Sequence, residues 1–205
     1  MTLDATIRAV QAKLGVTIDG DAGTETWNAI HLAIVGQPSP ADSCVLLPCK
    51  SEWRFLKVFR EGDDIVVPAA IATVFGWDTA LGVRDPDDNG ECASGKGTRD
   101  HPGLLGCALP VSVARRSTRG SAFPKVPQLP WLAPVVVTRG GKSVTVALID
   151  NGPSAPPPND PAPAGIDLTP AACLALGVPI EDIRRNRVAF TVSFRLPGAG
   201  QYVQG

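Results

Sequence analysis

The sequence predicts an α+β, mainly β protein, in which a small helical N-terminal module precedes a β-barrel with one or two short helices. Helical spacing of apolar residues dominates only the first part of the chain. Beyond Trp53, short β-branched runs are separated by Gly, Pro and Asp. The 205 residues suffice for one domain of ordinary size and a small satellite.

The N-terminal module is predicted from one clear helical stripe and a second one after a turn. Ile7, Val10 and Leu14 recur at intervals of three and four, and Gly15 ends the helix. A turn-rich stretch at 19–23 precedes a second stripe over 24–34. Residues 37–52 mix Pro, Ser, Asp and Cys without periodicity. We therefore expect a helical module at 1–40, a linker at 41–52 and a barrel domain at 53–205.

The barrel is predicted from runs that resemble strands and from one helix between them. The runs lie at 55–59, 65–67, 71–75, 135–137, 144–149 and 188–194. For the helix, Thr169 is a suitable N-cap, Pro170 suits the first helical position and Gly177 ends it. The proline-rich stretch 153–163 is expected to be an irregular loop.

Charge and hydropathy exclude several classes of function. The formal net charge is −1 and the basic residues do not gather, so nucleic acid is not an expected partner. The apolar runs are shorter than the ~20 residues that span a bilayer. The first thirty residues have neither the basic nor the apolar region of a signal peptide, so standard secretion is not expected.

The five cysteines form no CxxC pair, and neither a metal site nor a cofactor is expected. In an oxidising compartment, Cys44 with Cys49 and Cys92 with Cys107 could each close a short loop. We expect Cys92 and Cys107 to lie near each other, and Cys173 to be a buried apolar residue.

The N-terminal segment resembles the small peptidoglycan-binding domains found on cell-wall hydrolases. The resemblance covers about a sixth of the chain and rests on an ordered set of residues: Val10-Gln11, Leu14-Gly15, Asp19-Gly20, Gly23, Thr26 and Ala29. It implies that Asp19 and Trp27 contact the glycan. Local chemistry leaves another interpretation open, in which Asp19 and Gly20 form a tight turn and Trp27 fills the space between two helices.

The larger domain resembles double-psi β-barrel proteins of the rare-lipoprotein-A, expansin and glycoside hydrolase class. The similar segments are 72–76, 88–91 with 107–110, and 144–153 with 165–172. The last pair contains the sequence VTVALIDNGP followed by GIDLTPAA, and it is the strongest motif in the chain. The resemblance implies a six-stranded double-psi barrel. A loop at 117–131 and the proline-rich stretch depart from the family pattern.

The same resemblance implies a catalytic set of Asp150, Glu91, His101 and Asp167. Cleavage of a glycosidic bond needs a carboxylic acid that protonates the leaving oxygen, and Asp150 at the end of an apolar strand is predicted as this acid. Phe75, Asn89 and Gly152 are expected to contact substrate. Each acid has a structural alternative: an Asx turn for Asp150 and a helix cap for Asp167.

Together these features predict a peptidoglycan-active enzyme of the lytic transglycosylase or glycan hydrolase type, without a cofactor. The alternative is a wall-binding or structural protein whose barrel grips glycan without cleaving it. The partner is peptidoglycan and the place of action is the bacterial cell wall. Without a signal peptide, delivery by a phage virion, a holin or a secretion machine is expected.

Overall fold

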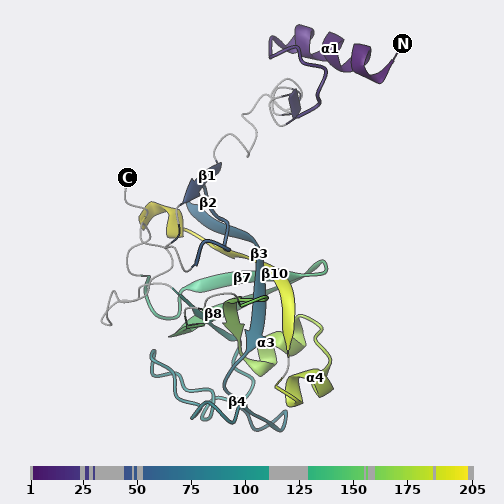
Figure 1. Ribbon diagram of the computed structural model, residues 1–205. Coiled ribbons are helices and arrows are strands. Elements are labelled where there is room, and N and C mark those ends of the chain that lie inside the picture. The colour runs from purple at the N-terminus through teal and green to yellow at the C-terminus, as the bar shows by residue number, and fades with distance from the viewer. Residues whose placement is uncertain are drawn as a thin grey trace. The chain divides into compact units, whose positions relative to one another are not determined.

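The computed structural model describes residues 2–23, 26–27, 30, 44–47, 49, 53–110, 129–154, 156, 160–186 and 188–202. The chain divides into two compact units, Met1–Val45 and Leu46–Gly205 (Figure 1). Within the described ranges, none of the helices has the length and apolar character needed to cross a membrane.

The N-terminal unit begins with helix α1, Leu3–Leu14, as the apolar spacing predicts. The Oγ1 atom of Thr2 accepts a hydrogen bond from the Ala5 amide and so caps the first turn. Gly15 ends the helix in the left-handed conformation, with φ of 72°. The predicted second helix at 24–34 and the motif residue Ala29 lie largely or wholly outside the described residues.

Six of the described strands close a barrel in the second unit. They are β3 (Asp64–Val74), β6 (Gly106–Leu109), β7 (Pro134–Arg139), β8 (Lys142–Asn151), β9 (Ala164–Leu168) and β10 (Ala189–Leu196). The order around the barrel is β3-β10-β7-β8-β6-β9, and β9 pairs again with β3. Two pairings are parallel, β3 with β9 and β6 with β8, and the other four are antiparallel. The predicted fold class, mainly β with a six-stranded barrel, is confirmed.

Shorter elements surround this barrel (Figure 1). Strands β1 (Cys44–Leu47) and β2 (Val58–Glu61) extend the sheet beyond β3. Strand β1 lies within the residues 41–52 that were predicted to be a linker. Strands β4 (Trp77–Asp78) and β5 (Val83–Arg84) form a separate pair. Helices α3 (Pro170–Ala175) and α4 (Ile180–Arg184) lie between β9 and β10, and a 3₁₀ helix, η3 (Ala199–Tyr202), follows β10.

Helix α3 confirms the predicted helix, with Thr169 at the N-cap position, but the Thr169 side chain does not cap it. Thr169 makes no capping hydrogen bond to α3. Its hydroxyl instead donates to the Leu104 carbonyl at 2.6 Å and accepts from the Gly106 amide at 3.1 Å. The hydroxyl is therefore used to join the start of α3 to the start of β6.

Alternating residues of the strands fill the barrel interior. On β3, Ala72 and Val74 belong to the main core, and on β9 so do Ile166 and Leu168. Because side chains alternate along a strand, the residues between them, Thr73 and Asp167, point out of the barrel.

The expected proximity of Cys92 and Cys107 does not produce a disulfide, since both are free thiols. Cys107 faces the main core from β6. Cys92 packs against Phe75, Ala108 and Ile149, a small cluster outside the barrel wall. The two thiols therefore lie on opposite sides of β6, which explains why they do not pair.

Candidate functional site

A row of four residues crosses the outer surface of the barrel on adjacent strands. Thr73 on β3 pairs with Asp167 on β9, Asp167 pairs with Ala108 on β6, and Ala108 pairs with Asp150 on β8. The residues that flank Thr73, Asp167 and Ala108 in sequence face the main core, so these three side chains point outward. We call Thr73, Asp167, Ala108 and Asp150 the aspartate row. Pairing of the strands thus brings together the two acids of the strongest sequence motif.

The titration of the Asp167 carboxyl is strongly perturbed. Burial, together with the negative charges of Asp85, Asp150 and Asp88, raises the pKa of Asp167 to about 6. A hydrogen bond from the Thr73 hydroxyl to Oδ1 of Asp167 acts in the opposite direction. The carboxyl is therefore protonated over a pH range in which an ordinary aspartate is charged. Because Asp167 lies within β9 and bonds to Thr73, it does not cap α3.

Asp150 is held in a different way, by backbone amides. Its Oδ1 atom accepts hydrogen bonds from the Asn151 amide at 2.8 Å and from the Ala93 amide at 3.3 Å. The Asx turn weighed for Asp150 is not formed, because the Gly152 amide donates to the Leu109 carbonyl instead. Hydrogen bonds from amides favour the charged form of a carboxylate. Asp150 also fastens the loop between β5 and β6 to the end of β8.

Gly152 lies beside Asp167 with no side chain between them. A Cβ atom on Gly152 would stand 3.1 Å from Oδ2 of Asp167 and 3.4 Å from Cβ of Ala108. The glycine therefore leaves open the space next to the Oδ2 atom. Phe75, the other predicted contact residue on this side, is 9% exposed and packs with Ala108 and Ile149. It therefore packs beside Ala108 on the outer face of the barrel.

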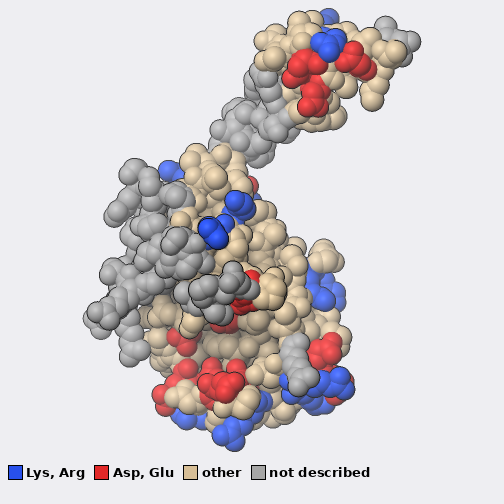
Figure 2. Space-filling view, viewed as in Figure 1, with Lys and Arg blue, Asp and Glu red and all other residues tan. Residues whose placement is uncertain are grey.

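The surface around the aspartate row is acidic. Figure 2 shows Asp and Glu side chains gathered over the end of the barrel near β4, with Lys and Arg at the margin. The loop between β5 and β6 contributes Asp85 and Asp88, whose charges reach Asp167. Asp85 is fixed in turn by Asn186, whose Nδ2 donates to Oδ1 of Asp85 at 3.0 Å. No group of three or more His, Cys, Asp or Glu in the described part of the chain is arranged to hold a metal ion.

Glu91, Asn89 and His101 lie on the loop between β5 and β6, and their partners among the described residues belong to that loop. Nδ2 of Asn89 donates to Oε2 of Glu91 at 3.3 Å, and Arg99 approaches Oε1 at 3.8 Å. Nδ1 of His101 lies 2.9 Å from the Gly97 carbonyl oxygen. All three side chains are exposed. These contacts join the loop to itself and leave the two aspartates as the centre of the site.

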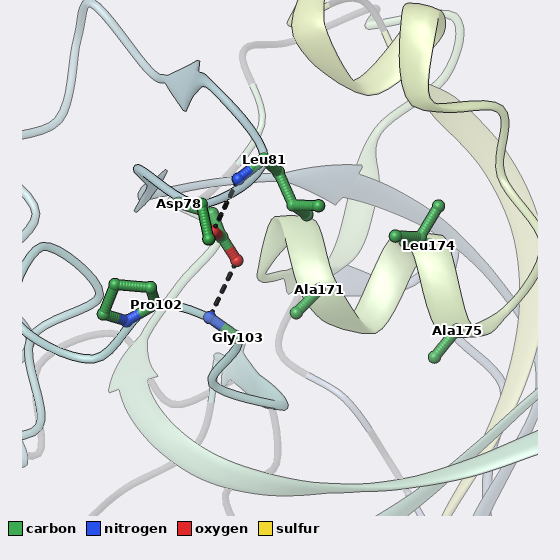
Figure 3. Close-up of a pocket in the computed structure, with 8 residues that line it drawn as sticks. Asp78, Leu81, Pro102, Gly103, Ala171, Leu174 and Ala175 are labelled. Atoms are coloured by element: carbon green, nitrogen blue, oxygen red, sulfur yellow. Dashed lines mark hydrogen bonds between the residues drawn. The ribbon is translucent and has the colours of Figure 1, made fainter.

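Away from the aspartate row, a hollow of about 350 Å³ lies on the outer side of α3 and is lined mainly by apolar side chains (Figure 3). Asp78 is 1% exposed beside it, and its carboxylate accepts from the Leu81 amide at 3.1 Å and the Gly103 amide at 2.9 Å. The second of these bonds ties β4 to the chain just before β6. None of the residues in the aspartate row lines this hollow.

In the N-terminal unit, the residues of the predicted wall-binding motif form one hydrogen-bond network around Gln11. The Gln11 side chain is buried, and its Nε2 donates to Oδ1 of Asp19 at 2.7 Å, to the Asp21 carbonyl at 2.9 Å and to Oγ1 of Thr26 at 3.0 Å. Its Oε1 accepts from the Gly20 amide at 2.9 Å. The motif thus explains the turn at 19–23.

The two predicted contact residues of this unit differ in accessibility. The Asp19 carboxylate is occupied within the turn, where hydrogen bonds from the Asp21 amide and the Gln11 side chain lower its pKa. Trp27 is 58% exposed, so the alternative in which it fills the space between helices does not hold for the described residues. An exposed indole is a flat apolar surface with a polar edge.

Sequence reasoning found both aspartates but missed Thr73, Ala108, Asp85 and Asp88. Thr73 carried a local signal, since it is the polar residue inside the apolar run 71–75. Ala108 carried none, because its position between the aspartates depends on pairing between distant strands.

Comparisons with known proteins find similarity among solved structures. No protein-family model and no curated protein matches the chain. Among solved structures, the chain is similar to the Streptomyces papain inhibitor, with 17% sequence identity and a TM-score of 0.36, over 66% of this chain and 96% of that one.

Proposed function

We propose that this protein cleaves the glycan strands of peptidoglycan, with Asp167 as general acid and Asp150 as general base. The observation that supports this proposal best is the unequal environment of two neighbouring carboxyls. Burial and nearby negative charge raise the pKa of Asp167 to about 6, whereas amides donate to Asp150. Glycosidases use such a pair, one carboxyl kept protonated and the other charged.

In the proposed reaction, Asp167 transfers its proton to the glycosidic oxygen as the bond from that oxygen to the anomeric carbon breaks. Asp150 takes a proton from a water molecule, whose oxygen bonds to the anomeric carbon. The two proton transfers balance, and the products are a free alcohol and a reducing end. This assignment exchanges the roles expected from sequence, where Asp150 was the acid.

The spacing of the strands supports cleavage by water. Asp150 and Asp167 are separated by the single strand β6, so their Cα atoms lie roughly 9–10 Å apart at the usual strand spacing. Side chains that project in parallel from these strands would hold their carboxyl groups at about the same separation, and about 6.5–9.5 Å leaves room for a water molecule in inverting glycosidases. We therefore expect hydrolysis in preference to formation of an anhydro product.

The N-terminal unit is proposed to bind the wall, as its resemblance to peptidoglycan-binding domains implies. Binding by this unit would raise the effective concentration of the barrel at its substrate. The alternative proposal, a barrel that binds glycan without cleavage, makes the same prediction for wall binding and the opposite one for products.

Mass spectrometry of purified sacculi after incubation with the whole chain tests the proposal. Muropeptides with reducing ends are expected, and their release should decrease as the pH rises through about 6, where Asp167 loses its proton. Anhydro-muropeptides would identify a lytic transglycosylase. Sacculi that bind the protein and release nothing would support the binding alternative.

A further inference from the structure

Thr73 is a polar residue within an apolar stretch of β3. The adjacent residues Ala72 and Val74 belong to the main core, and Thr73 points outward between them. Its partner in the parallel pairing with β9 is Asp167. The hydroxyl of Thr73 donates a hydrogen bond to Oδ1 of Asp167, across 94 positions of sequence.

The two oxygens of the Asp167 carboxyl therefore have different surroundings. Oδ1 accepts the hydrogen bond from Thr73, so this oxygen is engaged as an acceptor. Oδ2 lies next to the space that Gly152 leaves open, 3.1 Å from where a Cβ atom of residue 152 would stand. When the carboxyl is protonated, the proton belongs on Oδ2, because Oδ1 already receives one from the hydroxyl.

We propose that Thr73 is the positioning residue of the acid, which holds Oδ1 of Asp167 so that the protonated Oδ2 faces substrate across Gly152. The role of Asp167 as the acid rests on the proposed function. The hydrogen-bonded orientation does not rest on it, because it follows from the pairing of β3 with β9 and from the contact itself.

Nearby charges act on the pKa of Asp167 together with the hydrogen bond from Thr73. Loss of that bond should therefore be measurable as a change in this pKa. The titratable groups that interact electrostatically with Asp167 lie on the loop between β5 and β6, on β8, on β6 and on α3: Asp85, Asp88, Asp150, Cys107 and Cys173. The three aspartates disfavour a charged Asp167, and burial raises the pKa of both thiols, so these stay neutral. The Thr73 hydroxyl opposes these effects, since it favours the charged carboxylate.

The test is a titration of the Asp167 carboxyl carbon by NMR in the full chain and in three variants. Thr73→Val removes the hydroxyl at nearly constant volume and should raise the midpoint by about half a unit to one unit. Thr73→Ser keeps the hydroxyl and should titrate like the parent. Thr191→Val changes an exposed threonine on the neighbouring strand β10 and serves as the matched control.

An unchanged midpoint in Thr73→Val would overturn the proposal. An equal rise in Thr73→Ser would also overturn it, because packing of the methyl group would then be the cause. If the parent cleaves sacculi, the limb of its pH profile due to Asp167 should move to higher pH in Thr73→Val and stay in place in Thr191→Val. If the parent cleaves none, the proposed function fails, while the titration still decides whether Thr73 orients Asp167.

Discussion

Asp150 and Asp167 lie on either side of Ala108, each on a strand adjacent to β6. The methyl group of Ala108 is the smallest side chain that could separate them. Their environments differ, since burial raises the pKa of one and backbone amides donate to the other. The proposed roles of the two carboxyls, one as acid and one as base, rest on this difference.

The first prediction concerns the acid. Asp167→Asn should reduce the release of muropeptides from sacculi about 10²–10⁴-fold, because the amide cannot donate the proton that the leaving oxygen needs. Release is measured as initial rate by chromatography. Asp87→Asn is the matched control, since Asp87 is an exposed acid on the neighbouring loop.

Asp150→Asn should also lose activity, because an amide is a poor base. If Asp150→Asn stayed inactive while Asp167→Asn kept full activity, Asp150 would be the acid, as the sequence predicted. If neither change mattered in an active parent, the aspartate row would not be the catalytic site.

The second prediction is a pH-dependent gain of stability in the same variant. Folding raises the pKa of Asp167 to about 6 from an unfolded value near 4. The stabilising contribution of this group is therefore complete below about pH 4 and is lost as the pH rises through about 6. Asp167→Asn, which never ionises, should exceed the parent in free energy of unfolding by about 2–3 kcal/mol at pH 7.

Urea unfolding of both proteins between pH 4 and 7 measures this difference. The two curves should converge toward pH 4, where the parent carboxyl is also neutral. A constant difference across the range would mean that ionisation of Asp167 is not its source. Greater stability in an inactive variant is the pattern expected when a site is kept for function at a cost in stability.

The third prediction uses the space beside Oδ2. Gly152→Ala places a methyl group 3.1 Å from Oδ2 of Asp167, in the direction from which substrate is proposed to approach. Muropeptide release should fall roughly tenfold or more, comparable to the cost of about 1.4 kcal/mol in the transition state. Circular dichroism should show an intact barrel. Full activity in the folded variant would place the substrate elsewhere.

The sequence predicted much of the fold because its signals are local. Alternating and β-branched runs mark strands such as β8, and the pair of Pro170 and Gly177 marks α3. Whether Cys92 and Cys107 pair could not be predicted from local signals. Spacing along the chain could not tell that Cys107 faces the core and Cys92 the outside of β6.

The site was predicted in part for the same reason. The motif pointed to Asp150 and Asp167, which are both in the row, but not to their protonation. The protonation of Asp167 depends on Thr73, which the pairing of β3 with β9 brings next to it, and on Asp85 and Asp88 of a loop that is distant in the sequence. Glu91 was assigned by motif to the same site, yet its partners in the described chain are Asn89 and Arg99.

The fourth prediction concerns Gln11 in the N-terminal unit. Its buried amide joins α1 to the turn at 19–23 through three hydrogen bonds and to Thr26 through a fourth. Gln11→Ala leaves those partners unmatched, at a cost of about 1–3 kcal/mol. Hydrogen exchange at the Gly20 amide, which donates to Gln11, should become fast. Lys13→Ala, which changes an exposed residue of the same helix, should leave the Gly20 amide protected. Unchanged protection in Gln11→Ala would show that the turn holds without this network.

The last prediction separates wall binding from cleavage. Since Leu46–Gly205 forms its own compact unit with its own core, a fragment of these residues should fold and keep the intrinsic activity of the barrel on soluble glycan fragments. It should, however, sediment poorly with sacculi, because binding by the N-terminal unit is lost. Trp27→Ala in the full chain should weaken sedimentation in the same direction, because an exposed indole can pack on a sugar ring. Gln11 and its network stay intact in that variant, so protection of the Gly20 amide serves as the folding control. If the fragment sediments as well as the full chain, the barrel alone holds the wall and the proposed role of the N-terminal unit is lost.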